Sequence, residues 1–198
     1  MADARPDVPS EAEWIRRCQS GDTEAFAPLV ETYKRRIFHL VFHLVRRRED
    51  VEDLVQEIFM KAFAAISSYN FQSAFGTWLN RIAVNHCYDY LRRHRASRVS
   101  YFWEMSEEGQ RGIESTARSP EPGGLNNEEH LAVDDLVSKL LARAPAEDRI
   151  ILTLKEIEEK SVEEVAEILS LKSSTVKVRL HRARKRMVKD LKKWQEGR

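Results

Sequence analysis

Residues 161–189 decide how this chain is interpreted, and they read SVEEVAEILSLKSSTVKVRLHRARKRMVK. Ser161 and Glu164 have the spacing of a capping box, in which each side chain accepts a hydrogen bond from an N–H group at a helix start. We therefore predict a short helix, a turn, and a second helix capped by Ser173 or Ser174. Two helices joined by a tight turn form a helix–turn–helix, the unit that places its second helix in the DNA major groove.

The second helix of this unit has one apolar face and one cationic face. Apolar residues follow Val176 at i+4, i+7 and i+11, which places them on one side of a helix. From residue 172 to residue 193 the chain has ten Lys or Arg and one acid, Asp190. Side chains near the start of such a helix read base edges, while its cations bind phosphates. A solvated amphipathic helix is the alternative interpretation. The candidate DNA contacts are Ser174, Thr175, Lys177, Val178, Arg179, His181, Arg182 and Lys185. Among the cations, Arg179 and Lys185, together with Arg184 and Lys189, are directed mainly at phosphates.

Residues 51–66 have the clearest helical periodicity in the chain. From Val51, apolar residues recur at i+3, i+4, i+7, i+8, i+11, i+12 and i+15, which is one face of a helix. The opposite face carries Asp53, Gln56 and Glu57. Its acidic charge is unsuited to DNA, so a partner of this face is expected to be a protein. Without further context, an ordinary solvated helix face is the simpler interpretation.

Residues 74–98 interleave aromatic residues with five arginines and a single acid. We predict a helix from about residue 74 to residue 94, with Trp78, Ile82 and Leu91 facing inward. Aromatic rings can stack on bases that have left the DNA helix while arginines hold the backbone. The Asn85 amide offers both donors and acceptors to a base edge. Taken alone the signal is weak, because aromatic residues of this kind more often pack in a core.

The chain divides into two helical blocks, and no strand pattern competes with them. We interpret residues 1–10 as a disordered leader, residues 11–97 as a first domain and residues 131–198 as a second. Residues 98–130 are rich in Ser, Gly, Pro and acids, which is typical of a flexible linker. Only 7 Gly and 6 Pro occur in 198 residues, which favours a mostly helical chain. The predicted fold class is therefore all-α, with two domains.

Further helices are expected inside each block. Residues 26–45 are apolar over a wide arc, which is typical of a central core helix, and Asp22 is placed to cap it. Residues 131–141 have an amphipathic pattern, and Pro145 fits the start of another helix.

Several classes of function are excluded by what the sequence lacks. It has no phosphate-binding glycine loop, no HExxH motif and no spacing that suggests a nucleophile, so no catalytic residue or cofactor is expected. Cys18 and Cys87 have no metal-ligand spacing, and they fit a reduced cytoplasmic setting. His39 and His43 have a spacing that could bind metal, but no third ligand is evident, so no metal site is predicted. No apolar run is long enough to cross a membrane.

Five segments, in this order, resemble the extracytoplasmic-function sigma factors, which are bacterial RNA polymerase subunits. They are GDTEAF at 21–26, DVEDLVQE at 50–57, FGTWLNRIAVN at 75–85, SVEEVAEI at 161–168 and STVKVRLHRAR at 174–184. The second and the last of these are the specific ones, above all as a pair. The resemblance implies an alternative sigma factor, not an enzyme, that binds core RNA polymerase and directs promoter recognition, DNA melting and initiation.

The resemblance also implies a role for each surface. The acidic face would dock on the clamp of the largest polymerase subunit, with the flap as a further contact of the chain. Its contact residues would be Asp53, Leu54, Gln56, Glu57 and Met60. The segment 74–95 would melt and read the −10 element, with Asn85 and the following turn near a flipped base. Its contact residues would be Trp78, Arg81, Asn85, His86, Tyr88, Arg92 and Arg93. The helix–turn–helix would read the −35 element.

Two positions depart from the family's usual pattern. Val178 stands where the family often has Ser, so an apolar contact with a thymine methyl group replaces a hydrogen bond. Residues 86–90 are unusually aromatic, which leaves the preferred −10 sequence open. Two further hypotheses concern the whole chain. Two weak DNA sites would gain effective concentration once both are fixed on the polymerase. The free chain would pack its two domains together and cover both DNA surfaces, and an anti-sigma protein is a possible partner.

Two other functions compete with this interpretation. One is a stand-alone helix–turn–helix repressor or activator, whose first block would be a sensing or dimerisation domain. Such a regulator would bind duplex DNA tightly without polymerase, usually as a dimer. The other is a helical adaptor that binds only proteins, which does not explain the ten cations between residues 172 and 193.

Overall fold

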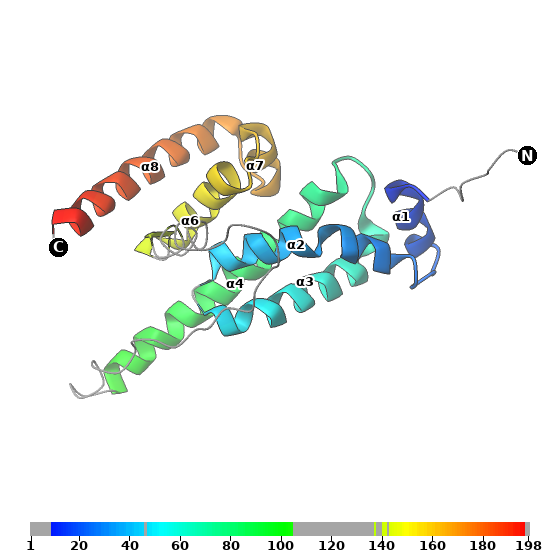
Figure 1. The fold of residues 1–198 in the computed structure, drawn as a ribbon, viewed down its shortest axis with the longest axis horizontal. Helices are drawn as coiled ribbons and strands as arrows, with labels where there is room; N and C mark the ends of the chain where they lie inside the picture. The colour runs from blue at the N-terminus through cyan, green and yellow to red at the C-terminus, as the bar shows by residue number, and fades with distance from the viewer. Residues whose placement is uncertain (1–8, 46, 105–136, 138–139, 142, 197–198) are drawn as a thin grey trace, which may run out of the picture.

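The computed structural model describes residues 9–45, 47–104, 137, 140–141 and 143–196. Within these residues every element is helical and no strand occurs. The N-terminal domain contains α1 (Glu11–Gln19), α2 (Phe26–Leu44), α3 (Val51–Ala65) and α4 (Phe75–Glu104), with single turns of 3₁₀ helix at Arg48–Asp50 and Ile66–Ser68. The C-terminal domain contains α6 (Ala146–Leu152), a π-helical turn (Thr153–Ile157), α7 (Val162–Ile168) and α8 (Ser173–Glu196). The expected all-α, two-domain fold is confirmed (Figure 1).

The turn between α1 and α2 is built by Gly21 and Asp22. Gly21 has a φ of +101°, a conformation that costs little only without a Cβ. Oδ1 of Asp22 accepts hydrogen bonds from the N–H groups of Glu24 and Ala25, and Oδ2 accepts from Arg17. Asp22 therefore supports the chain just ahead of α2 from inside the preceding turn, while Ala25 holds the position directly before the helix.

The core of the N-terminal domain follows the predicted periodicities. Each fully buried Leu or Ile in it contributes about 1.5–3 kcal/mol relative to exposure. Trp78, Ile82 and Leu91 of α4 pack against this core, as expected. However, α4 continues beyond residue 94 to Glu104, so helical structure extends into the segment predicted to begin the linker. Fully buried residues include Ile15 from α1, Leu29, Ile37, Leu40, Val41 and Leu44 from α2, Val51, Ile58 and Ala62 from α3, and Phe75, Leu79, Ala83 and Cys87 from α4.

The C-terminal domain contains the predicted helix–turn–helix. The capping box is present, because Oγ of Ser161 accepts from the Glu164 N–H at 3.0 Å and Glu164 accepts from the Ser161 N–H at 2.8 Å. A turn separates α7 from α8, and in it Ser170 has a φ of +52°. Ser173 is the first residue of α8 and therefore lies within the helix, not ahead of it. The helix predicted at 131–141 lies largely outside the described residues.

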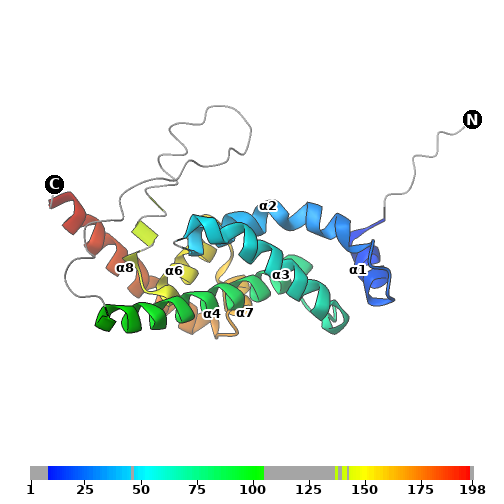
Figure 2. The same ribbon diagram turned by 90° about the horizontal axis from the view of Figure 1, so that it is seen from below.

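The two domains lie against one another. Figures 1 and 2 show α6 and α7 beside α2 and α4, with the C-terminal domain on one side of the N-terminal bundle. Nη1 of Arg149, a buried residue, donates to the Leu44 carbonyl at 2.8 Å. Nη2 of Arg81 donates to the Glu167 carbonyl, also at 2.8 Å. The two domains therefore pack against each other in this structure, as was hypothesised for the free chain.

Candidate DNA-binding and protein-docking surfaces

The second helix of the helix–turn–helix, α8, divides into the two faces that were predicted. Val176, Leu180 and Ala183 are buried against α6 and α7, and Met187 is partly buried. The opposite face is open to solvent, and half of the Val178 surface is exposed. Of the eight candidate contacts, Thr175 is half-buried and seven are exposed: Ser174, Lys177, Val178, Arg179, His181, Arg182 and Lys185. Packing of the domains therefore leaves the cationic face of α8 uncovered, contrary to the hypothesis that both DNA surfaces are masked.

Some cations of α8 are already paired inside the C-terminal domain. Arg184 contacts Glu156 at 2.7 Å, and Arg186 contacts the buried carboxylate of Asp148 at 2.7 Å. Arg179 lies 3.9 Å from Glu147, a distant pair between exposed groups that contributes little. Arg184 was expected to bind phosphate, but in the structure its guanidinium pairs with Glu156 of the same domain.

Other cations of α8 remain available to a phosphate. Within the described part of the chain no ion pair involves Lys177, Arg182 or Lys185. These side chains share the exposed face with His181. Neutralisation of DNA phosphates by such free cations releases counterions, which makes the binding strong and dependent on salt.

A polar stripe runs along the exposed side of α4. Asn85, Tyr88 and Arg92 are exposed and follow one another at i, i+3 and i+7, so they share one face. Arg92 also contacts Asp89 at 3.2 Å, and the exposed Arg93 donates to the Asp89 carbonyl. Of the seven candidate residues of this helix, these four present side chains that a DNA strand can reach.

The remaining candidates of α4 have other partners. Arg81 lies one turn before Asn85, but its guanidinium donates to the Glu167 carbonyl of α7. Trp78 is half-buried and packs against Tyr69 and Phe75, with ring centroids 5.3 Å apart in both cases. The turn that follows Asn85 is a turn of helix, because α4 continues without interruption to Glu104.

His86 is buried, which differs from the expectation that it contacts DNA. Only 5% of its surface is exposed, and its Nε2 lies 2.7 Å from Oε2 of Glu57 on α3. Burial lowers the pKa of His86, and the charge of Lys61 lowers it further, against the opposing effect of Glu57. His86 therefore ties α4 to α3 in the folded domain.

The loop before α4 contains an exposed ring that was not selected from the sequence. Phe71 is 41% exposed and has a φ of +60°, which is strained for a residue with a bulky side chain. The Arg16 guanidinium lies over its ring at 5.3 Å, and the ring packs against Tyr69, which in turn contacts Trp78. The only sequence signal was an aromatic residue in a polar segment, which does not distinguish a presented ring from a buried one.

The exposed side of α3 is acidic, with an apolar residue at its far end. Asp53, Gln56 and Glu57 are exposed, and Met60 is exposed to 64%. Leu54, which was placed in the same contact set, is only 4% exposed and packs in the core. The face is repulsive to phosphate, so it suits a protein with cationic and apolar groups.

Other features of the described residues carry no chemistry of their own. They contain no group of three or more His, Cys, Asp or Glu that could hold a metal ion. Among them, no helix combines the length and the apolar character needed to cross a bilayer. Cys18 and Cys87 are free thiols in the core, and burial raises the pKa of Cys87 to about 12.

Comparisons with known proteins agree with this arrangement. Residues 29–97 match the family sigma-70 region 2, and residues 134–187 match sigma-70 region 4. The ECF RNA polymerase sigma factor SigW of Bacillus subtilis strain 168 is 31% identical over 180 residues, which cover 90% of this chain and 95% of SigW. The ECF RNA polymerase sigma-E factor of Escherichia coli strain K12 is 36% identical over 182 residues, covering 86% of this chain and 88% of that protein.

Among solved structures, the sigma factor RpoE in complex with the anti-sigma factor NepR from Bartonella quintana has the same fold. The TM-score is 0.64 at 27% identity, over 86% of this chain and 98% of RpoE. The exposed recognition helix, the polar stripe on α4 and the acidic α3 face therefore lie in a chain that is related to these proteins over nearly its whole length. The chain belongs to the extracytoplasmic-function family of RNA polymerase sigma factors.

Proposed function

We propose that this sigma factor divides promoter recognition between two helices while a third holds the polymerase. In this proposal α8 reads the −35 duplex, the stripe on α4 binds the −10 element, and α3 docks on core RNA polymerase. The observation that carries the proposal is the free cationic face of α8, which lies opposite a buried apolar face in a capped helix–turn–helix. The role proposed for each residue follows from the exposure of its side chain and from the partners that this side chain already has.

At the −35 element, α8 enters the major groove with the start of the helix nearest the bases. Lys177, His181 and Arg182 contact bases or nearby phosphates, because they are exposed on the outward face. Val178 is half exposed and provides an apolar contact for a thymine methyl group. Arg179 and Lys185 contribute mainly charge, which makes this part of the binding dependent on salt.

At the −10 element, the stripe of α4 holds a strand whose bases have left the duplex. Extrusion of a base costs a few kcal/mol, which must be offset by contacts that exist only in the open state. The Asn85 amide is exposed and supplies donors and acceptors to a base edge. Tyr88 offers a ring for stacking, and Arg92 and Arg93 supply charge for the backbone.

The acidic face of α3 is the proposed contact with the clamp of the largest polymerase subunit. Asp53 and Gln56 are exposed, and Met60 adds an apolar contact at the end of the helix. Glu57 takes part as well, although one of its oxygens already lies beside His86. The flap is a proposed further contact of the chain, as for a factor that positions a −35-binding domain.

The chain acts as a binding subunit and not as an enzyme in this proposal, and it works in the cytoplasm, where core polymerase is found. The related sigma factor RpoE was solved in complex with the anti-sigma factor NepR. We propose that an anti-sigma protein likewise restrains this chain.

Run-off transcription with purified core polymerase tests the proposal. The chain is added to core enzyme and a mixture of promoter templates, and transcript start sites are mapped. The proposal expects defined starts that depend on the chain. Tight binding to duplex DNA without polymerase, with no effect on transcript starts, would support the stand-alone regulator instead.

A further inference from the structure

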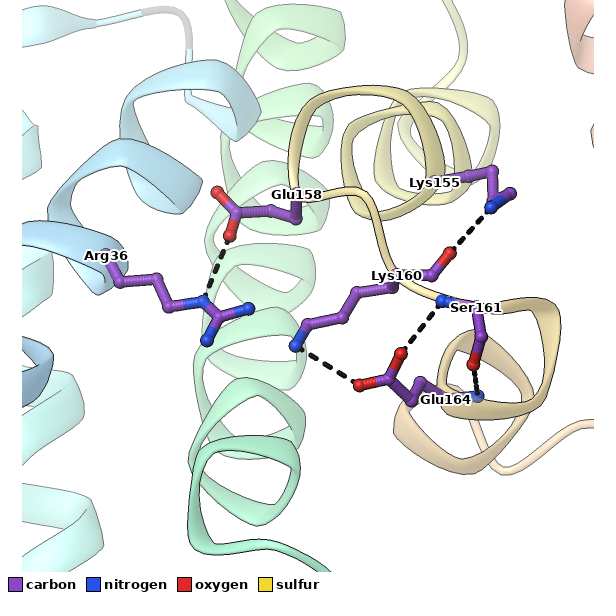
Figure 3. A network of polar contacts seen from close by, with 6 residues as sticks. All are labelled: Arg36, Lys155, Glu158, Lys160, Ser161 and Glu164. Carbon is purple, nitrogen blue, oxygen red and sulfur yellow. Dashed lines mark hydrogen bonds and ion pairs between the residues drawn. The ribbon is translucent and has the colours of Figure 1, made fainter.

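We propose that Glu158 is a latch that holds the two DNA-binding domains of the free sigma factor together, through Arg36 and His39 of α2. The inference rests on the proposed function, because it concerns the two surfaces that would contact the promoter. Only 6% of the Glu158 side-chain surface is exposed. Nε of Arg36 lies 3.3 Å from Oε2, and Nδ1 of His39 lies 3.5 Å from Oε1 (Figure 3).

A buried carboxylate has to be paired, and Glu158 finds its partners, Arg36 and His39, across the domain boundary. Burial alone would raise the pKa of Glu158, but hydrogen bonds from His39 and Arg36 outweigh this effect and hold the pKa below its usual range. The pairing with Arg36 and His39 exists only while the domains are together. Removing one partner in that arrangement leaves a buried carboxylate with less compensation, which disfavours the closed arrangement and not the folding of either domain.

The C-terminal domain fixes the position of Glu158 in advance. The N–H of Glu158 donates to the Thr153 carbonyl, which closes the π-helical turn, and the next residue, Glu159, has a φ of +52°. Nζ of Lys155 donates to the Lys160 carbonyl at 2.9 Å, and Lys160 in turn contacts Glu164 of the capping box. Figure 3 shows this network behind Glu158, directing its carboxylate toward α2. A carboxylate held in this way loses little entropy when it pairs.

The closed arrangement cannot bind both promoter elements at once. The −35 and −10 elements are named for positions that differ by about 25 base pairs, which corresponds to about 85 Å of duplex at ~3.4 Å per pair. In the closed arrangement Arg81, beside the proposed −10 stripe, is hydrogen-bonded to the helix–turn–helix at 2.8 Å. The whole of α4, with 30 residues, is only about 45 Å long. Promoter binding therefore requires the Arg36–Glu158 contact to break, and core polymerase would have to supply the compensating contacts.

Fluorescence energy transfer in the free, full-length chain tests the latch. Dyes are attached at Ala64→Cys on α3 and Lys192→Cys on α8, both of which are exposed positions. The native thiols are buried, with raised pKa values, so they react slowly with maleimides. The variants are Glu158→Gln, Arg36→Gln and the two combined. The control is Glu163→Gln, which removes one negative charge from the exposed side of α7.

Glu158→Gln is expected to raise the ratio of open to closed molecules about tenfold, the effect of losing one hydrogen-bonded charge pair. Arg36→Gln is expected to open the chain further, since it leaves a buried carboxylate with His39 alone. The double variant should be no more open than Arg36→Gln, because Glu158→Gln removes the carboxylate that Arg36→Gln leaves without its guanidinium partner. Glu163→Gln should match the wild type, and the far-UV circular dichroism of every variant should show the wild-type helix content.

Unchanged energy transfer in Arg36→Gln and in Glu158→Gln would overturn the latch, as would additive effects in the double variant. If Glu158→Gln loses helix content, Arg36→Gln decides alone, since the Arg36 side chain on α2 is 42% exposed and its replacement leaves the core of α2 intact. The unlabelled wild type is also assayed for run-off transcription. Absence of start-site selection there would contradict the proposed function, whereas normal transcription with no opening by the variants would contradict the latch only.

Discussion

The two surfaces proposed to contact DNA differ in how much of each is occupied before DNA arrives. On α8, seven of the eight candidate residues are exposed, and Lys177, Arg182 and Lys185 take part in no ion pair within the described residues. On α4, His86 is buried and Arg81 is bonded to α7. The proposed duplex-binding face of α8 is therefore almost fully exposed before DNA binds. The helix proposed to hold melted DNA, α4, also packs in the core of its own domain, so part of its candidate surface is already occupied.

The largest effect is expected on the exposed cationic face of α8. Replacing Lys177 and Arg182 together by Ala removes two free cations and should weaken −35-dependent transcription by at least ~30-fold, from about 2 kcal/mol or more of lost contacts. The slope of log affinity against log salt should fall by about two. Arg184→Ala is the matched control, since Arg184 already pairs with Glu156 and should matter much less. Wild-type transcription by the double variant would remove both residues from the DNA face.

The α4 stripe should show its effect on DNA opening and not on assembly. Asn85→Ala removes the amide that is proposed to contact an extruded base, and open complexes should decrease about tenfold for a loss of ~1.5 kcal/mol. Permanganate reactivity of the −10 thymines measures the opening, and a pull-down measures core binding in parallel. A template melted beforehand should restore much of the activity. An unaffected open complex would remove Asn85 from this role.

The docking face should respond to charge. Asp53→Lys should weaken binding to core polymerase several-fold, up to about tenfold. The substitution replaces an exposed acid by a cation, which would repel the cationic groups expected on the partner. Adding Glu57→Lys should weaken binding further, although this change also disturbs His86. Glu163→Lys, on α7, is the control of equal charge change. Equal binding by all of these variants in a titration with labelled core enzyme would place the docking surface elsewhere.

The smallest effect on promoter choice is expected at His86, and it sharpens the contrast within α4. His86→Ala removes a buried side chain beside Glu57 and should lower the free energy of unfolding by about 1–3 kcal/mol while promoter preference stays the same. Tyr88→Ala, two residues later and exposed, should do the reverse. Urea denaturation and run-off transcription distinguish them. A stable His86→Ala variant that fails to open promoters would return His86 to the DNA surface.

Apolar periodicity predicted the helices well, because a helix that buries one face needs apolar residues at a spacing that follows the helical repeat. The faces of α3 and α8, the capping box at Ser161 and the turn before α8 all follow from local spacing. The errors lie where a residue is close to the edge of a face. Leu54 shares α3 with the exposed acids but points into the core, and His86 adjoins Asn85 yet turns toward Glu57.

The remaining features depend on contacts between distant parts of the chain. Nothing near Glu158 in the sequence shows that its partners come from α2, or that Arg149 donates to the carbonyl of Leu44. The extension of α4 to Glu104 also opposed a local signal, since the composition after residue 97 favours a linker. The sequence therefore predicted which residues carry charge, but not which of those charges are already paired.

The central claim is that α8 and α4 read separate promoter elements, and promoter selection from a randomised library tests it most directly. Core polymerase is supplied in turn with the wild-type chain, Lys177→Ala and Asn85→Ala, and the transcribed promoters are sequenced. The account predicts that Lys177→Ala relaxes base preference only near −35 and that Asn85→Ala does so only near −10. If both variants relax the same element, or if the wild-type chain selects no start site, the division of labour between the two helices is wrong.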